Sequence, residues 1–507
     1  MDWTITPVEM KALEDAYMSE TGVPGALLME HAAQGVCAAL RRHVAPDAAV
    51  LFLCGPGNNG GDGYAAARLW QAAGGRSLVW ELSARPRGDA GLNRLLAQSS
   101  GVPLHLVEDA PAALTPCAAV VDALFGTGLD RPVRGTAAAL IRLANAAKAP
   151  VVAVDIPSGL DGTAGRILGD AVRAIETVTF HRIKTGLLLG DGPACTGAIT
   201  VQPILIPPSY GQARGMACLS PADMPRLMPP RPVCAHKGDL GRVVLLVGSL
   251  GMAGAAALCA RACLKTGAGL TTVLCRLSVL PMVQVLAPGA VCVPLPEEGG
   301  QLTPDAAEMV RHALQGATSA VVGCGIGQDT ALLPLLEAFR QAACPVVWDA
   351  DALSLLAAHP ALLPLPGSAV ITPHPGEAAR LLGCKASDVT ADMPAALSRL
   401  QAKCDCAVLL KGARTLMANG ADRAVNRFGS PALARGGSGD ILSGMLGALL
   451  SRARLCPGQT RLETLQLAAL LHGLAGMRAA ERFGEDHATP EDIIACIGQS
   501  AAAESLP

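Results

Sequence analysis

The sequence predicts an α/β protein with two domains, and three observations support this. The chain has 507 residues, which is more than one ordinary hydrophobic core accommodates. Short β-branched or leucine-rich runs alternate with amphipathic runs rich in alanine and leucine, which is the pattern of βα units around a largely parallel sheet. Hydrophobic residues make up 51% of the chain, as suits tightly packed layers of helix and sheet.

Each half contains six candidate strands, and a proline-rich stretch separates the halves. The candidates in the first half are 50–54, 77–80, 119–122, 151–155, 177–180 and 199–206. Those in the second half are 243–247, 270–275, 320–322, 346–349, 369–372 and 408–410. Eight prolines cluster between positions 203 and 232. We therefore expect a first domain over 1–212, a linker over 213–234 and a second domain over 235–507.

Two segments that could be mistaken for targeting or membrane sequences are better explained as folded structure. The N-terminal stretch has early acids and no apolar leader core, and Thr6, Pro7 and Glu9 form the cap, first-turn proline and capping-box acid of a helix. Segment 243–260 is uncharged and long enough to cross a bilayer. Glycines interrupt it, however, which predicts strand, turn and helix. We therefore expect a cytoplasmic protein with no membrane partner.

Charge and cysteine content exclude further classes of partner. The formal net charge is −2, lysine and arginine are scattered singly, and aromatic residues make up only 3%, so no nucleic-acid partner is expected. The 17 cysteines are an odd number with irregular spacing, typical of reduced, mostly buried thiols. No cysteine pair has the neighbouring ligands of a zinc site. We also expect the protein to form a homo-oligomer.

The stretch 434–442 reads ARGGSGDIL, a glycine-rich turn that opens an apolar helical run. Its glycines allow backbone N–H groups to converge on an anion, and the helix N-terminus adds partial positive charge. A carboxylate at Asp440 would repel that anion unless it served as a general base for a hydroxyl that attacks a phosphoryl group. In the alternative interpretation, Ser438 and Asp440 only cap the helix.

In the first half, three loops follow candidate strands. GPGNNGGDGY at 55–64 supplies backbone donors for phosphates and side-chain oxygens for a cation or a polar group. It is not the GxGxxG dinucleotide fingerprint. Asp122 precedes FGTGL, and Asp155 begins DIPSGLDG. Because the carboxyl ends of parallel strands lie at one edge of a sheet, these loops are expected to face one cleft. Alternatively, Asp62 belongs to an Asx-turn and Asp155 caps a helix.

The motifs GNNGGDG, DALFGTGL and DIPSGLDG, in this order, resemble the YjeF N-terminal family of epimerases of hydrated NADH and NADPH, over about residues 6–206. The resemblance implies a Rossmann-like fold and a potassium site at Asn59, Asp122 and Ser158. It also implies that Asp155 contacts the hydrated nicotinamide and has a catalytic role. Lys184 matches a lysine of the family pattern, without an assigned role. The implied dinucleotide-binding residues are Asn58, Asn59, Gly60, Gly61, Asp62, Gly126, Thr127, Gly128, Leu129, Asp130, Arg131 and Pro132.

The second half contains VVGCGIG, VVWDADAL, ITPHPGEAARLLG, VLLKGARTL and GGSGD. This series resembles the YjeF C-terminal family, the NAD(P)H-hydrate dehydratases with a ribokinase-like fold, from about Leu219 to the end of the chain. The resemblance implies contacts with the hydrated cofactor by Ala255, Gly325, His374 and Asp440. The implied nucleotide-binding residues are Lys411, Gly412, Ala413, Arg414, Thr415 and Gly439.

Independent support for these assignments differs from residue to residue. Lys411 ends a candidate strand and can meet phosphate charge. His374 lies in a rigid turn between prolines, although a lone histidine is often a satisfied structural group. Asp349 and Asp351 are candidates for magnesium, but acids at a strand end also cap helices. The approach to the last glycines, VNRFGSPALA, differs from the Asn-Gly-Pro-rich approach more common in relatives, so the nucleotide loop is expected to differ in detail.

Together the halves predict two three-layer α/β domains, Rossmann-like and then ribokinase-like, that repair hydrated nicotinamide cofactors. The first would interconvert the R and S epimers. The second would dehydrate the S form using ADP, or ATP, with magnesium, giving NAD(P)H, AMP and phosphate. One alternative is a vitamin-precursor kinase of the ribokinase fold, which HPGEAARL and KGART disfavour. Another is a non-catalytic nucleotide-binding first domain, which the presence of Asp122 and Asp155 disfavours.

Overall fold

The computed structural model describes residues 2–501 except 110, 212–214 and 232. The chain divides into two compact units, one beginning at Trp3 and ending at Met216, the other beginning at Ala217. Each unit has its own sheet and its own buried core, so the two-domain prediction is confirmed.

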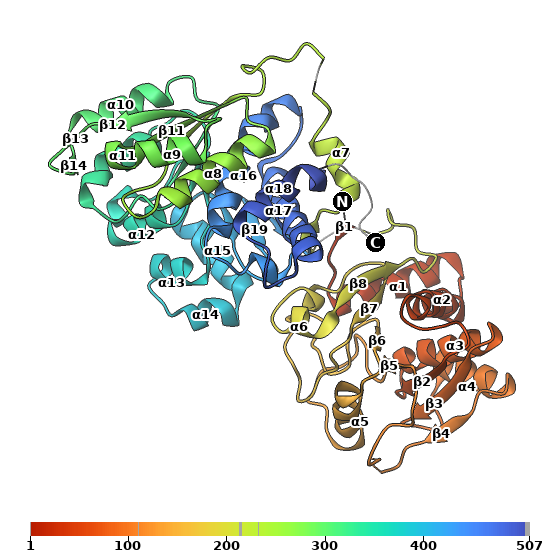
Figure 1. The fold of residues 1–507 in the computed structure, drawn as a ribbon. Helices are drawn as coiled ribbons and strands as arrows, with labels where there is room; N and C mark the ends of the chain where they lie inside the picture. Colours follow the sequence, from red (N-terminus) through yellow and green to blue (C-terminus); the bar gives the residue numbers. More distant parts are fainter. Residues whose placement is uncertain (1, 110, 212–214, 232, 502–507) are drawn as a thin grey trace. The chain divides into compact units, whose positions relative to one another are not determined.

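The first domain is built on a seven-stranded sheet in the order β4-β3-β2-β5-β6-β7-β8 (Figure 1). Every neighbouring pair is parallel. The strands are β2 (Ala49–Cys54), β3 (Arg76–Glu81), β4 (Leu104–Leu106), β5 (Ala119–Ala123), β6 (Val151–Val154), β7 (Glu176–Phe180) and β8 (Ala198–Gln202). The strand order reverses beside β2, which lies between β3 and β5. The crevice beyond the carboxyl ends of β2 and β5 is therefore the place where folds of this kind bind ligands.

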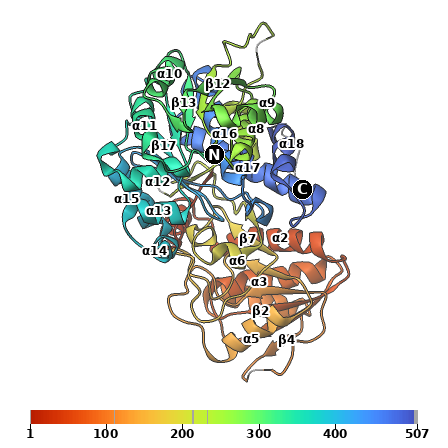
Figure 2. The same ribbon diagram turned by 60° about the vertical axis from the view of Figure 1, so that its left-hand side comes forward.

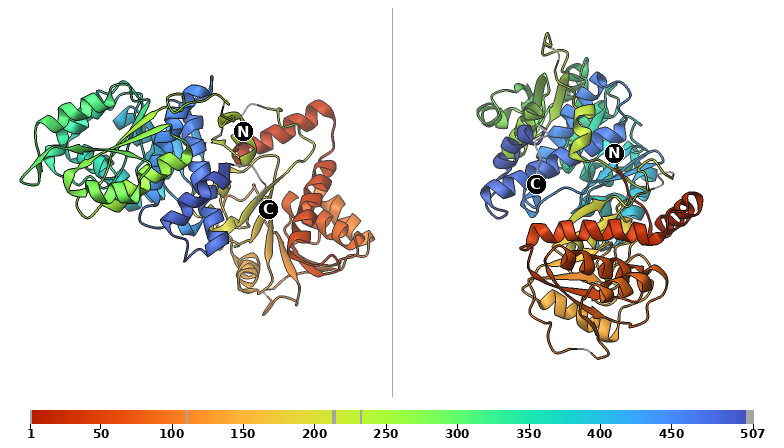
Figure 3. Two further views of the ribbon diagram at one scale, coloured as in Figure 1. Left: turned by 45° about the horizontal axis from the view of Figure 1, so that its top comes forward. Right: turned by 90° about the vertical axis from the view of Figure 1, so that its right-hand side faces the viewer.

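Helices cover both faces of this sheet, as a three-layer domain requires. They are α1 (Pro7–Thr21), α2 (Gly25–His43), α3 (Asn58–Ala72), α4 (Gly88–Ser99), α5 (Gly135–Ala146) and α6 (Gly192–Thr196). Val50 and Phe52 of β2 belong to the core cluster that includes α2 and α3, whereas Leu51 and Leu53 belong to the cluster that includes α5. This alternation follows from the two-residue period of a strand. The red helix in both views of Figure 3 is α1.

The second domain is built on a larger sheet in the order β1-β9-β20-β19-β18-β17-β16-β15-β10-β11-β12. From β18 to β12 the neighbouring strands are parallel, whereas β18, β19 and β20 pair antiparallel. The strands are β1 (Asp2–Trp3), β9 (Ala217–Cys218), β10 (Arg242–Leu246), β11 (Leu270–Arg276), β12 (Val291–Leu295), β15 (Ser319–Val322), β16 (Val346–Trp348), β17 (Val370–Ile371), β18 (Ala407–Leu410), β19 (Leu416–Asn419) and β20 (Asp422–Val425). A separate hairpin joins β13 (Glu297–Glu298) and β14 (Gln301–Leu302).

Two groups of helices pack on this sheet, on opposite sides in Figure 2. One group is α8 (Ala253–Thr266), α16 (Ser438–Arg452), α17 (Arg461–Phe483) and α18 (Pro490–Ala501). The other is α10 (Asp305–Leu314), α11 (Leu333–Arg340), α12 (Asp351–Ala358), α13 (Pro375–Leu382), α14 (Ala386–Ala391) and α15 (Met393–Cys404). Shorter helices are α7 (Met224–Leu227) and α9 (Leu280–Leu286). Helices α8 and α16 approach so closely that a Cβ on Gly444 would lie 2.1 Å from the Cys259 carbonyl oxygen. Glycine is required there.

The structure confirms most of the expected elements and corrects three. Every candidate strand overlaps an observed strand, and the Thr6 capping box is present. The strand expected over 199–206 ends at Gln202, because Pro203 has no N–H for the ladder. The strands β1, β4, β9, β12, β13, β14, β19 and β20 were not predicted. No described helix is long and apolar enough to span a membrane, and segment 243–260 forms β10, a turn and the start of α8.

The third correction concerns the expected linker over 213–234, part of which lies outside the described residues. Within it, Ala217 of β9 pairs with Ala424 of β20, and α7 packs against α17. The second domain therefore begins at Ala217 rather than at residue 235. Prolines misled the prediction because two of them begin helical turns, Pro221 in a 3-10 turn and Pro225 in α7.

Candidate active sites

In the first domain, the glycine-rich motif after β2 forms the N-terminal turn of α3. The helix begins at Asn58, so the backbone N–H groups of Asn58, Asn59 and Gly60 have no acceptor within the helix and point out of its end. The Gly61 N–H already donates to the Gly57 carbonyl at 3.1 Å. The glycines permit very close backbone packing: a Cβ on Gly55 would lie 1.8 Å from the Leu124 carbonyl oxygen, and one on Gly60 would lie 1.9 Å from the Gly55 carbonyl oxygen. The motif thus brings the α3 N-terminus against the end of β5.

The three residues implied as a potassium site come together at this point. Ser158 donates to the Asp122 carboxylate from its backbone N–H at 2.7 Å and from its hydroxyl at 2.6 Å. Asn59 lies against Gly126, where a Cβ would be 2.9 Å from Asn59 Oδ1. Asp122 is fully buried, and burial raises its pKa to about 6 although the hydrogen bonds from Ser158 lower it. The Asn59 Nδ2 atom is buried without a hydrogen-bond partner.

Asp155 and Lys184 form a buried ion pair beside this cleft. The Lys184 Nζ atom lies 2.7 Å from Asp155 Oδ1 and donates to the Phe180 carbonyl at 2.9 Å. Thr179 donates its hydroxyl to the same carboxylate oxygen at 3.1 Å. Asp155 follows β6 with a φ of +63°, a left-handed conformation that is strained for a non-glycine residue. The carboxylate therefore meets a lysine rather than capping a helix, and Lys184 gains a role that the sequence did not provide.

A second buried acid, Asp62, lies near this pair. Its side chain is almost fully buried. Burial raises its pKa well above the ordinary value, the charges of Asp155 and Glu14 raise it further, and Lys184 partly offsets them. Glu14 on α1 was not identified from the sequence. Its position four residues after the buried Met10, on the same helix face, was the feature that could have indicated it.

The implied loop 126–132 lies mostly near the surface, and its role stays a prediction.

In the second domain, α16 begins at the expected glycines. Gly437 caps the helix with a φ of +93°, and Asp440 lies in the first turn. Burial raises the Asp440 pKa to about 6, with Asp349 adding to the shift, whereas a hydrogen bond from the Cys324 thiol and the charge of Lys411 lower it. A helix N-terminus that can bind an anion thus carries a carboxyl group that gains or loses its proton near pH 6. This is the geometry expected of a general base beside an anion site.

Lys411 lies beside this helix end but already has carboxylate partners. Its Nζ atom is 2.8 Å from Asp349 Oδ1 and 3.7 Å from Glu377 Oε2. Ser443 donates to the other Asp349 oxygen at 2.6 Å. A Cβ on Gly439 would lie 3.5 Å from Lys411 Nζ, so the ammonium adjoins the anion-binding turn. Burial lowers the Lys411 pKa, but the charges of Asp349 and Glu377 raise it more, so the side chain is cationic.

The other predicted residues of this domain occupy different positions. Gly325 adjoins Ala255, since a Cβ on Gly325 would lie 3.1 Å from the Ala255 Cβ. His374 caps α13, where its Nδ1 atom accepts a hydrogen bond from the Gly376 N–H at 3.0 Å. This nitrogen therefore has the structural role that the sequence offered as an alternative to ligand binding. Its Nε2 atom lies on a half-exposed ring and faces Glu377 at 3.4 Å. His374 is therefore connected to Lys411 through Glu377.

Asp349 and Asp351 do not converge as a pair of magnesium ligands. Asp349 is committed to Lys411 and Ser443, whereas Asp351 accepts from the Gly327 N–H at 2.9 Å. Within the described part of the chain, no group of three or more His, Cys, Asp or Glu side chains could hold a metal ion. In the nucleotide loop, Arg414 is half-buried and its Nε atom has no partner, whereas Gly412 and Ala413 are exposed.

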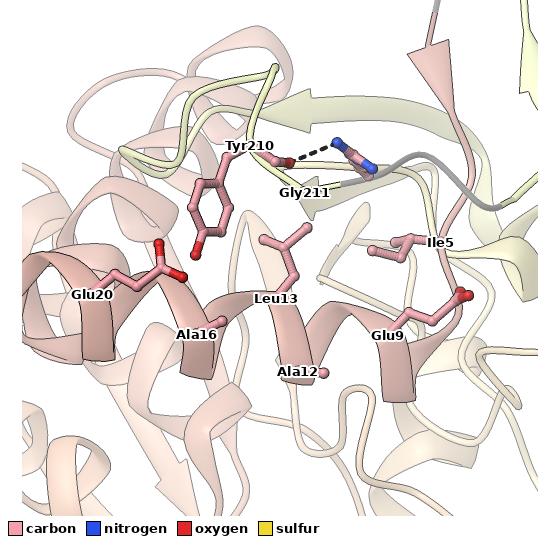
Figure 4. Close-up of a pocket in the computed structure, with 9 residues that line it drawn as sticks. Ile5, Glu9, Ala12, Leu13, Ala16, Glu20, Tyr210 and Gly211 are labelled. Carbon is pink, nitrogen blue, oxygen red and sulfur yellow. Dashed lines mark hydrogen bonds between the residues drawn. The ribbon is translucent and has the colours of Figure 1, made fainter.

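A separate hollow of about 450 Å³ lies on the other face of α1 (Figure 4). Apolar side chains and two acids line it, among them Leu13, Ala16, Glu9, Glu20 and Tyr210. None of the predicted site residues contributes to it. The cleft at β2 and β5 and the α16 N-terminus remain the sites that the chemistry supports.

Comparisons with known proteins agree with this division. A family model for NAD(P)H-hydrate dehydratase matches residues 243–499, and one for the YjeF-related protein N-terminus matches residues 25–186. A bifunctional NAD(P)H-hydrate repair enzyme of Moorella thermoacetica is 36% identical, with coverage of 97% of this chain and 95% of its own. One from Escherichia coli strain K12 is also 36% identical, with coverage of 88% and 84%. A solved ribokinase-like superfamily protein of Enterococcus faecalis V583 is 26% identical, with a TM-score of 0.50, and the match covers 57% of this chain and 95% of that one.

The fold and the arrangement of these residues define a two-domain α/β enzyme, with a Rossmann-like first domain and a ribokinase-like second domain. Similarity over nearly the whole length gives the family. The chain belongs to the bifunctional NAD(P)H-hydrate repair enzymes.

The buried position of the Lys411–Asp349 pair predicts a large stability effect. Lys411→Met should destabilise the second domain by about 3 kcal/mol, because a buried carboxylate loses its counter-charge. The double variant Lys411→Met/Asp349→Asn should recover part of this loss, since no unpaired charge remains. Urea unfolding of the wild type, both single variants and the double variant measures the coupling. Additive effects of the two substitutions would contradict the ion pair.

Proposed function

We propose that the chain repairs hydrated NADH and NADPH by two reactions, one in each domain. The first domain interconverts the R and S epimers, and the second dehydrates the S epimer at the expense of ADP, giving NAD(P)H, AMP and phosphate. The observation that carries the proposal is Asp440 in the first turn of α16, beside Gly439 and Lys411. The full-length similarity to repair enzymes supports it in both domains.

In the second domain, Asp440 takes the proton from the ring hydroxyl of the hydrate. The oxygen attacks the terminal phosphoryl group of the nucleotide, whose charge the N–H groups of the α16 N-terminus stabilise. Lys411 adds positive charge at the same point, although its ion-pair partner Asp349 partly neutralises that charge. Phosphate is a much better leaving group than hydroxide, so its departure with loss of a ring proton restores the dihydronicotinamide.

ADP is the expected phosphoryl donor, as the family resemblance implies, and ATP is the alternative. Magnesium bound with the nucleotide supplies charge neutralisation at the phosphates. The described acids do not form a magnesium cage of their own, so most of its ligands would be phosphate oxygens and water, as magnesium usually prefers. Asp351, whose charge raises the Asp440 pKa, is a further candidate oxygen ligand.

In the first domain, the N–H groups at the start of α3 and the loop 126–132 are the proposed dinucleotide contacts. Asp155 is the proposed contact to the hydrated ring. The residues Asn59, Asp122 and Ser158 are proposed to hold potassium. The donor set fits this ion, since Asp122 is a buried carboxylate with no ion-pair partner among the described residues. Turning the Asn59 amide would exchange its unpartnered nitrogen for an oxygen.

The kinase alternative predicts a different product. A vitamin-precursor kinase would use the same anion hole and base but release a stable phosphate ester. The family match of both domains favours repair, because such a kinase has no use for an epimerase domain. Cytoplasmic location and a homo-oligomeric state remain predictions.

Asp440→Asn tests the base. The amide keeps nearly the same shape but cannot take a proton, so dehydration should fall about a hundred- to ten-thousand-fold, while epimerisation persists. In the wild type, kcat/KM for dehydration should decrease as pH falls through about 6, because the base must be deprotonated and the Asp440 pKa lies there. Both reactions are measured on one preparation. Near-normal dehydration in the variant would remove Asp440 from this role.

Asp122→Asn tests the potassium site. The amide can still accept from Ser158 but lacks the charge that attracts a cation. In the wild type, potassium at about 100 times its Kd should stabilise the first domain by about 2.7 kcal/mol relative to equal ionic strength without potassium. The variant should lose this stabilisation and the potassium dependence of epimerisation. Identical potassium titrations of thermal unfolding for both proteins would show that the ion binds elsewhere or not at all.

A further inference from the structure

Glu14 lies on the face of α1 that is turned into the first domain. Met10, four residues earlier and therefore on the same helix face, is only 2% exposed. The residues that line the separate hollow in Figure 4, such as Leu13, Ala16 and Glu20, occupy the opposite face of the helix. Glu14 is half-buried, so its side chain is directed toward the interior and not toward that hollow.

Backbone contacts fix α1 against the segment that carries Lys184. The Ile5 N–H donates to the Ile183 carbonyl at 2.9 Å, and the Thr185 N–H donates to the Ile5 carbonyl at 2.9 Å. Ile5 thereby forms a parallel bridge with Lys184. The Thr6 capping box begins the helix directly after this bridge. The position of Glu14 relative to the Lys184–Asp155 pair is therefore set by the fold and not by a flexible terminus.

Three carboxyl groups lie close enough to one ammonium group to interact with it electrostatically. Glu14, Asp62 and Asp155 all interact electrostatically with Lys184. Lys184 is committed to Asp155 and to the Phe180 carbonyl, so it cannot neutralise the other two acids. Two negative charges in excess are costly in a buried site, and protons must compensate for them.

The acids of this cluster differ in their affinity for a proton. Burial raises the Glu14 pKa to about 7; Lys184 and, more weakly, Lys11 lower it, while Asp155 and Asp15 raise it. Burial, with the charges of Asp155 and Glu14, raises the Asp62 pKa well above its ordinary value. Asp155 faces the ammonium directly. Glu14 is thus the member that gains and loses a proton near physiological pH, which is what general acid–base catalysis requires.

We propose that Glu14 is the residue that transfers the proton in epimerisation, acting at the hydroxyl of the hydrated ring held at Asp155. The inference rests on the proposed epimerase function. Glu14 in its acid form protonates the hydroxyl oxygen, the C–O bond breaks, and water leaves while the ring nitrogen lone pair forms a C=N⁺ bond. A water molecule then adds to the opposite ring face and returns its proton to the Glu14 carboxylate. Atoms and charge balance, and no oxidant is needed.

The neighbouring groups suit such a reaction. The cation formed by loss of water lies beside the Asp155 carboxylate, which stabilises it electrostatically. Glu14 would thus perform the proton transfer, while the Lys184–Asp155 ion pair next to it keeps its own charges unchanged.

Glu14→Gln tests the proposal in the full-length chain. Conversion of the purified R epimer is followed chromatographically without nucleotide, with the uncatalysed rate subtracted. The variant should lose about a hundredfold or more in kcat, with KM nearly unchanged. The ionisation near pH 7 in its kcat/KM profile should disappear, because the amide does not titrate. Glu14→Asp should keep a titrating limb and part of the activity.

Glu20→Gln is the matched control, since it removes one acid from the opposite face of the same helix, and it should epimerise like the wild type. Circular dichroism and thermal unfolding verify that each variant folds. If Glu14→Gln does not fold, the pH dependence of kcat/KM for Glu14→Asp becomes the test. A kcat/KM pH profile of Glu14→Asp identical to that of the wild type would overturn the proposal. Activity of Glu14→Gln within threefold of the wild type would also overturn it. A wild-type chain that does not epimerise would instead refute the proposed function.

Discussion

Each domain buries one lysine against an aspartate beyond the carboxyl ends of its parallel strands, and both sites depend on this ion pair. The distances are 2.7 Å for Lys184–Asp155 and 2.8 Å for Lys411–Asp349. Further acids face each pair, Glu14 and Asp62 in the first domain and Glu377 and Asp440 in the second. Because carboxyl groups outnumber ammonium groups, burial leaves selected acids with raised pKa values. Removing a lysine would leave its aspartate buried and unpaired, with a large loss of stability.

The same arrangement gives each domain a different chemistry. In the first, the excess acids lie near the carboxyl ends of the strands at the switch point of the sheet, an arrangement suited to moving a proton on and off a neutral hydroxyl. In the second, the acid Asp440 stands at a helix N-terminus, where backbone N–H groups can hold the phosphoryl group that its substrate attacks. A proton-transfer site and a phosphoryl-transfer site are complementary, since a dehydratase for one epimer uses all the hydrate only if the other epimer is converted.

Short sequence patterns predicted those features that depend on residues close together in the chain. The glycines before Asp440, the strand positions and the Thr6 capping box follow from short-range conformational preferences, and the structure has them. The role of Lys184 depends on its contact with Asp155, which lies 29 residues earlier in the chain. The position of Glu14 depends on the bridge between Ile5 and Lys184, and no single-sequence periodicity encodes either contact. Proline content misplaced the domain boundary because proline also begins helical turns. His374 shows that one side chain can be a cap and a candidate ligand, which the sequence alone could not separate.

The central claim is that one chain converts either epimer fully into usable cofactor by two separate sites. The most direct measurement starts from the pure R epimer, under conditions where uncatalysed epimerisation is slow, with the full-length protein, ADP, magnesium and potassium. Recovery of dihydronicotinamide absorbance and release of phosphate are followed together. Complete recovery is expected, with one phosphate released per cofactor restored. Persistence of the R epimer, or accumulation of a stable phosphorylated product without recovery of absorbance, would contradict it.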